Sequence, residues 1–209
     1  MIVEKMTMEE LRIEILSDYS YVEGKIASLY PSVRRKMIKS KVKHVIEFFD
    51  YLSPKKNKWL LRIQFSKKDA VHTGVVHWVH NSGFHAVMKN NDGTLTYISG
   101  HLLDRYNERF LKLGDIQRIE ILKIFLKKNQ VQMAFPTGIK EDGTEELIWK
   151  SADGIVLGNQ KRIDGYSFFF MNTFITNEMQ FDNQIVHTNK LLEFLDEYIS
   201  VNYGFDKDQ

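Results

Sequence analysis

The chain has 209 residues, 43% of them hydrophobic, and carries a formal net charge of +2. This composition provides enough apolar surface for a folded core and lies far from that of disordered proteins. Because cysteine is absent, disulfides, thiolate metal sites and cysteine nucleophiles are excluded.

The N-terminal quarter is expected to be helical. Thr7 followed by two nearby glutamates is typical of a helix N-cap, and apolar residues then recur at helical spacing to about Asp18. A further helical stretch follows, and then a basic amphipathic helix is predicted over 31–52, where Pro31 suits a helix start. We therefore expect a helical N-terminal segment over 1–54.

Four β-rich runs follow, separated by polar turns. The tripeptide Asn91-Asp92-Gly93 is a strong signal for a hairpin between the last two of them. An antiparallel meander is therefore predicted, with strands at 59–65, 73–79, 84–89 and 94–98.

Two consecutive helices are expected to interrupt the strands, one from about 100 to 113 capped by Ser99 and one from 116 to 128 capped by Asp115. A second meander is predicted after them, with strands at 131–135, 145–150, 153–158 and 166–175. Apolar residues at helical spacing predict a terminal helix around 191–199.

The predicted fold class is therefore α+β, a mainly antiparallel β-meander with N-terminal helices, a central helix pair and a C-terminal helix. No stretch between the chain ends is long and polar enough to be a linker. We expect a single domain over 1–209, in which 55–209 form the α+β core.

Charge is unevenly distributed along the chain. Twelve Lys and Arg face two acids between Pro31 and Lys68, whereas seven acids face two lysines from Glu178 to the end. Two interpretations remain open: the basic region contacts a phosphate backbone, or the two oppositely charged regions pack side by side. The candidate nucleic-acid contacts are Arg34, Arg35, Lys39 and Lys43.

The segment after Ser99 carries the main chemical hypothesis. On a helix, His101, Arg105 and Arg109 share one face because they are four residues apart. An imidazole beside guanidinium groups favours its neutral, proton-accepting form, and arginines bind phosphate through two hydrogen bonds. RNA cleavage through the 2′-hydroxyl requires such groups.

A salt-bridged surface helix is the structural alternative for the same segment. Asp104 and Glu108 lie at spacings that allow ion pairs with Arg105, Arg109 or Arg118. In that interpretation His101 only lies near the helix start, and the charged groups have no catalytic role.

The order HLLDRYNERF, then DIQRIEILKIFLKKN, then a meander with DGIVLG and the strand FFFMNTFIT resembles the barnase and RelE-like superfamily of small ribonucleases and toxins. The resemblance covers 99–176 and implies RNA cleavage that needs neither metal nor cofactor. It implies that His101 is the base or acid, that Arg105 and Arg109 are phosphate ligands, and that Thr173 is a polar group on the last strand. About 98 residues precede this segment, unlike in the compact toxins.

The histidines suggest a rival chemistry, because His72, His77, His80, His85 and His101 lie within thirty residues and imidazoles bind zinc. Strand alternation opposes this interpretation, since 72 and 80 would point to one face and 77 to the other. The closely spaced ligand pairs of zinc sites are also missing, so no metal is predicted.

The expected partner is RNA or another nucleic acid, and the alternative function is that of a non-catalytic protein that binds nucleic acid or an acidic protein. The N-terminus lacks the basic region and apolar run of a signal peptide. No segment approaches the roughly 18 apolar residues of a membrane span. We therefore expect a cytoplasmic protein with no membrane partner.

Overall fold

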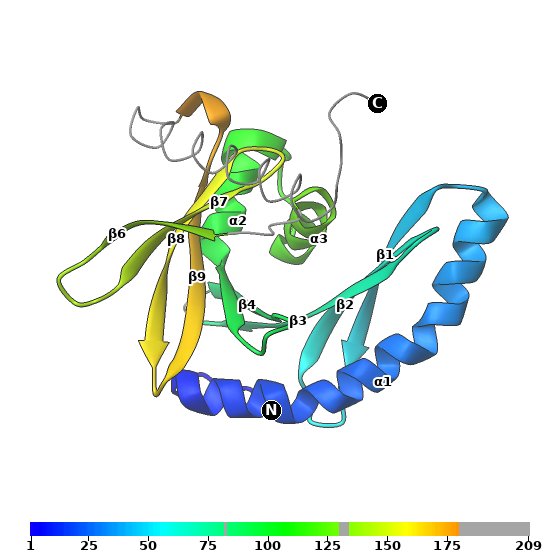
Figure 1. Ribbon diagram of the computed structural model, residues 1–209, viewed down its shortest axis with the longest axis horizontal. Helices are drawn as coiled ribbons and strands as arrows, with labels where there is room; N and C mark the ends of the chain where they lie inside the picture. Colours follow the sequence, from blue (N-terminus) through cyan, green and yellow to red (C-terminus); the bar gives the residue numbers. More distant parts are fainter. Residues whose placement is uncertain (82, 130–133, 180–209) are drawn as a thin grey trace.

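The computed structural model describes residues 1–81, 83–129 and 134–179. One nine-stranded sheet organises this part of the chain (Figure 1), with the order β1-β2-β3-β4-β5-β9-β8-β7-β6. Within it β5 and β9 run parallel, and the other neighbouring strands are antiparallel. The strands are β1 (His44–Leu52), β2 (Lys58–Ser66), β3 (Ala70–His80), β4 (Gly83–Lys89), β5 (Leu95–Ser99), β6 (Ala134–Ile139), β7 (Glu145–Lys150), β8 (Ile155–Ile163) and β9 (Tyr166–Ile175).

Helices cover both faces of this sheet. The helical elements are α1 (Met8–Ser40), α2 (Gly100–Tyr106), the π-helix η1 (Asn107–Leu111), α3 (Arg118–Lys128) and the short 3-10 helix η2 (Asn177–Met179). Figure 1 shows α1 on one side of the strands and α2 and α3 on the other. The mixed α+β class and the mainly antiparallel pairing are therefore confirmed, and the predicted C-terminal helix lies outside the described residues.

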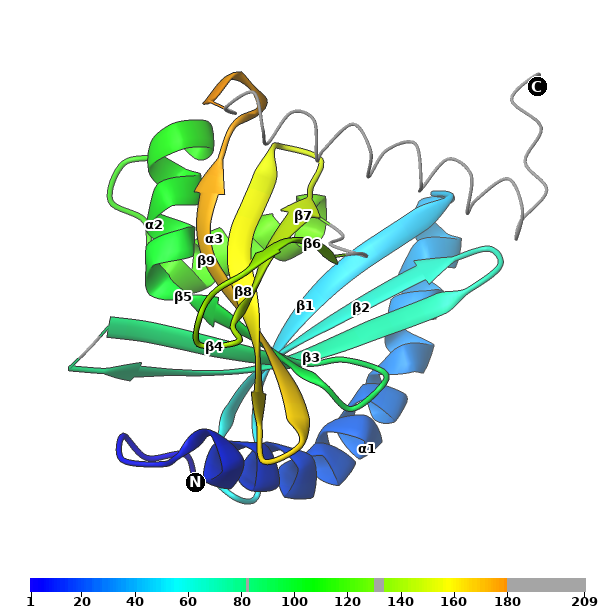
Figure 2. The same ribbon diagram turned by 60° about the vertical axis from the view of Figure 1, so that its left-hand side comes forward.

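The sheet is strongly twisted, as expected when a small rotation between neighbouring strands accumulates over many of them. In Figure 2, β8 and β9 cross the view at a steep angle to β3 and β4. The long helix α1 follows the curved sheet (Figure 1). None of the helices in the described ranges is long and apolar enough to cross a membrane.

The predicted N-cap at Thr7 is confirmed as a capping box. The Thr7 hydroxyl accepts a hydrogen bond from the backbone of Glu10 at 3.2 Å, and the Glu10 carboxylate accepts one from the backbone of Thr7 at 2.8 Å. The helix ends at Ser40, because Lys41 adopts a left-handed conformation.

The predicted division of the N-terminal segment into separate helices, the last over 31–52, is wrong. Helix α1 continues through Pro31 to Ser40, and 44–52 form strand β1. The error has a physical cause: Phe48 packs with the α2 and α3 side of the sheet, whereas Val45 and Phe49 pack under α1. A strand that contacts apolar partners on both faces has the continuous hydrophobicity that also suits a buried helix.

Two cores lie on opposite faces of the sheet. Under α1, Ile15, Val22 and Trp59 are among the fully buried residues. On the other face the core joins α2 and α3 to the strands, and it includes Leu102, Leu103, Tyr106, Phe125, Trp149, Val156 and Phe174. The position of α2, which carries His101, is therefore fixed by this second core.

A buried carboxylate fixes α1 on the strands. Asp18 is 0% exposed, and its Oδ2 accepts hydrogen bonds from Ser53, Asn57 and the indole of Trp59 at 2.7, 2.9 and 2.8 Å. Several donors are needed to stabilise a charge that is removed from water. The polar cluster thus sets the position of α1 against the β1–β2 turn.

Candidate functional site at the start of α2

Helix α2 begins where β5 meets β9. The Ser99 hydroxyl accepts a hydrogen bond from the backbone of Leu102 at 3.1 Å, which confirms the predicted N-cap, and it donates one to the carbonyl of Asn172 at 3.1 Å. A Cβ on Gly100 would lie 2.9 Å from the carbonyl oxygen of Phe84, so glycine permits the close approach of the helix to β4. His101 is therefore held at the end of the central strands.

His101 lies at the rim of an open pocket of about 290 Å³, which we call the His101 pocket. Its side chain is exposed, and no hydrogen bond or ion pair within the described part of the chain involves it. The pocket is lined by Gly83, Phe84, His85, Tyr97, Ser99, Gly100, His101, Asp104 and Arg118. The exposed imidazole of His101 therefore lines the same pocket as a second imidazole, that of His85, and the phenol of Tyr97.

His85 and Tyr97 form the wall of this pocket from neighbouring strands. The His85 Nδ1 and the Tyr97 hydroxyl are hydrogen-bonded, and His85 stacks on Trp78 with ring centroids 5.4 Å apart. Burial lowers the pKa of His85, and the nearby His80 lowers it further. His85 therefore favours its neutral form near pH 7.

Arg105, which was predicted to bind phosphate, and the nearby Arg118 are both engaged within the protein. Arg105 forms an exposed ion pair with Glu108 at 2.7 Å, and Arg118 binds Asp104 through two hydrogen bonds of 2.8 and 2.9 Å. These pairings are those of the salt-bridged surface helix. Exposed ion pairs contribute roughly 0–1 kcal/mol each, so an incoming phosphate can displace Glu108.

Arg109 and Thr173 are not among the residues that line the His101 pocket. The Nη1 of Arg109 donates to the carbonyl of Phe174 at 2.5 Å, which joins η1 to β9. Thr173 pairs with Leu157, and Leu157 packs on the face of the sheet away from α2 and α3. Of the four residues proposed for catalysis, the helical spacing places only His101 and Arg105 on one face of α2.

The histidines of β3 and β4 are engaged with different neighbours on the two faces of the sheet. His72 is hydrogen-bonded to Tyr30 at 2.6 Å and His80 is paired with Glu4 at 2.5 Å, whereas His77 stacks on Phe84 on the opposite face. Among the residues that the structure describes, no group of three or more His, Asp or Glu side chains could hold a metal ion.

The four basic residues proposed to contact nucleic acid lie at the end of α1 and just beyond it. Arg34, Arg35, Lys39 and Lys43 are all exposed. Their neighbour Lys36 is paired with Glu47 at 2.5 Å, but no ion pair within the described ranges involves these four. We call these four solvent-exposed cations the α1 basic patch.

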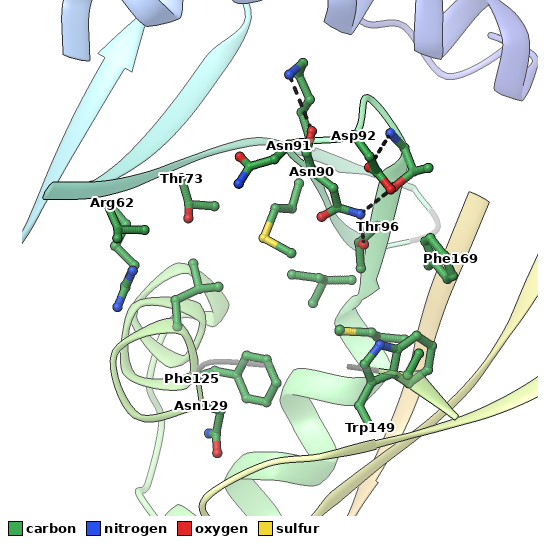
Figure 3. A pocket seen from close by; sticks show the side chains of 18 of the residues that line it. Arg62, Thr73, Asn90, Asn91, Asp92, Thr96, Phe125, Asn129, Trp149 and Phe169 are labelled. Carbon is green, nitrogen blue, oxygen red and sulfur yellow. Dashed lines mark hydrogen bonds between the residues drawn. The ribbon is translucent and has the colours of Figure 1, made fainter. Parts of the chain in front are cut away.

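A second cavity, which no sequence pattern predicted, lies between α3 and the sheet (Figure 3). Its volume is about 640 Å³. Arg62 lies at its edge and is only 5% exposed. Burial lowers the pKa of this guanidinium. In the sequence, Arg62 appears only as a single charged residue in the mostly apolar run WLLRIQF.

Comparisons with protein-family models, with curated proteins and with solved structures gave no match to this chain.

Proposed function

We propose that the protein is a metal-independent ribonuclease or ribonuclease-like protein that acts on RNA phosphodiesters at the His101 pocket. The observation that carries this proposal is the placement of His101, which is exposed at the rim of a pocket that also contains His85 and Tyr97. Groups that can transfer protons are the minimum requirement for cleavage through the 2′-hydroxyl.

The order of elements also supports the proposal. Two helices, α2 and α3, precede the antiparallel strands β6 to β9, as the resemblance to the barnase and RelE-like superfamily implies. The strands β1 to β5 extend the same sheet and, together with α1, enlarge the protein around this unit.

In the proposed reaction, His101 is either the base that takes a proton from the RNA or the acid that gives one to it. A base must remove the proton of the 2′-hydroxyl as its oxygen attacks phosphorus, and an acid must give a proton to the departing 5′-oxygen. Arg105, once released from Glu108, stabilises the charge on the phosphoryl oxygens. Arg109 contributes indirectly, because its hydrogen bond to the carbonyl of Phe174 joins η1 to β9.

The test is cleavage of a mixed-sequence single-stranded RNA by the purified protein in the presence of EDTA. We expect products that end in a 2′,3′-cyclic phosphate, and no cleavage of an otherwise identical strand with 2′-deoxy sugars. An RNA that stays intact, or equal cleavage of the deoxy strand, would contradict the proposed reaction.

A second candidate function is non-catalytic binding of nucleic acid, favoured by the α1 basic patch. Neutralising Arg34, Arg35, Lys39 and Lys43 to Gln should weaken RNA binding and reduce the slope of log K against log salt concentration. Each lost phosphate contact removes roughly 0.7 from that slope on a single strand, so four contacts correspond to about 3.

Fluorescence anisotropy with a labelled RNA at several salt concentrations measures this slope. A variant that neutralises the exposed residues Lys5, Lys25, Lys161 and Arg162 removes the same number of charges elsewhere. Equal slopes for the two variants would show that total charge, and not the α1 basic patch, determines binding.

A further inference from the structure

The cavity that contains Arg62, which we call the Arg62 cavity, is separate from the His101 pocket. None of its lining residues lines the His101 pocket as well. Figure 3 shows it between α3 and the strands, with Arg62 and Thr73 on one side and Trp149 and Phe169 on the other. Its volume of about 640 Å³ lies within the range of small-molecule sites.

Arg62 is a buried cation with few partners. Its Nη2 donates to the Gln64 amide oxygen at 2.5 Å, whereas its Nε is buried and has no hydrogen-bond partner among the described residues. No ion pair joins Arg62 to an acidic side chain within the described residues. Buried arginines normally bind carboxylates or other anions, because an unpaired charge removed from water is unfavourable. The buried guanidinium of Arg62 therefore has no anionic partner in the described part of the chain.

The rest of the cavity wall combines apolar rings with a few neutral polar groups. Phe125 is contributed by α3, Trp149 by β7 and Phe169 by β9. The rings of Trp149 and Phe169 meet edge to face, with centroids 6.4 Å apart. Aromatic walls of this kind bind flat apolar groups.

Two other charged residues line the cavity, and both interact within the protein. Asp92 accepts hydrogen bonds from the backbone and hydroxyl of Thr94 at 3.0 and 2.7 Å. Lys89 lies over the ring of Tyr19, with its Nζ 4.4 Å from the centroid. Arg62 is thus the cation of the cavity that is both buried and without an acidic or aromatic partner in the described chain.

We propose that the Arg62 cavity binds a small organic anion, whose charged group pairs with Arg62 and whose flat apolar body lies against Phe125, Trp149 and Phe169. The anionic group is a carboxylate or a phosphate, since both accept two hydrogen bonds from a guanidinium. This site does not depend on the proposed ribonuclease activity, and its test does not involve RNA.

The experiment compares two fluorescent probes that share the same rings. Anilinonaphthalene sulfonate carries an anionic group, and N-phenyl-1-naphthylamine does not. We expect the native full-length protein to bind the anionic probe more tightly. In Arg62→Met, the Kd of the anionic probe should rise roughly 10- to 100-fold, whereas the Kd of the neutral probe should stay the same.

Matched variants separate binding from folding. Arg162→Met removes an exposed arginine and should leave both affinities unchanged. Arg62→Gln also removes the charge but keeps a polar side chain beside Gln64. It should lose the preference for the anionic probe, so it provides the measurement if Arg62→Met does not fold. An anionic-probe Kd that is unchanged in Arg62→Met, or absent preference in the native protein, would overturn the proposal.

Competition then identifies the anionic group. 2-Naphthoate and 1-naphthyl phosphate both present flat rings, and the one that displaces the probe at lower concentration shows whether a carboxylate or a phosphate fits Arg62. Failure of both to displace the probe would count against a site for flat organic anions.

Discussion

His101→Ala should lower the rate of RNA cleavage roughly 10²- to 10⁴-fold, the usual contribution of a side chain that transfers a proton in the transition state. The stability of the protein should stay nearly constant, because His101 is exposed and no hydrogen bond in the described chain holds it. Initial rates on a fluorogenic RNA in EDTA, together with the thermal unfolding midpoint, measure both effects.

The control for this variant is another exposed histidine. His44 begins β1, on the opposite edge of the sheet from β6, and it does not line the His101 pocket. His44→Ala, purified in the same way, should cleave RNA at the native rate. Equal activity in the His101 and His44 variants would remove His101 from the reaction.

Local patterns predicted most of the strands and the start of α2 correctly. The hairpin signal at Asn91-Asp92-Gly93 marks the turn between β4 and β5, and a hairpin centred on Asp92 places His85 opposite Ser99, as the structure shows. The wall of the His101 pocket could therefore have been predicted from the turn, because the register of a hairpin follows from its turn.

The orientation of Thr173 depends on a β-bulge that the sequence does not reveal. Simple alternation from Met171, which is buried with α2 and α3, would point Thr173 to the same face. Gly158 instead pairs with Met171 and Leu157 with Thr173, so Asn172 is left without an opposite residue. One extra residue in a strand reverses the faces of those that follow.

Arg62 could not have been recognised as a site residue without the tertiary structure. It lies in the middle of β2, and the cavity that it lines is completed by α3 and by β7 and β9. Those elements follow it by more than fifty residues. The isolated charge is visible in the sequence, but the absence of an acidic partner depends on contacts between segments distant in the chain.

Gly158→Ala should destabilise the protein by about 3–5 kcal/mol, since it forces a methyl group into a position that the backbone occupies. A Cβ on Gly158 would lie 1.9 Å from the carbonyl oxygen of Phe170 and 2.8 Å from the ring of Trp149. Both contacts lie below van der Waals distance. The carbonyl of Phe170 cannot move away freely, because β9 is hydrogen-bonded to β8 on one side and to β5 on the other.

Urea unfolding followed by tryptophan fluorescence measures this loss, and Gly138→Ala is the matched control. A Cβ on Gly138 would meet its nearest described neighbour, the Glu146 carboxylate, at 3.6 Å, which is an ordinary contact. That substitution should change the free energy of unfolding by less than about 1 kcal/mol. Similar losses in the two variants would mean that the close approach of β8 to β9 is not what requires glycine.

The same substitution should also affect the proposed ribonuclease site. Moving the carbonyl of Phe170 displaces the bulge at Asn172, and the carbonyl of Asn172 accepts the hydrogen bond from Ser99 that fixes the start of α2. Under conditions in which Gly158→Ala is still folded, RNA cleavage should therefore fall relative to Gly138→Ala. Native cleavage by folded Gly158→Ala would show that the position of His101 does not depend on the bulge.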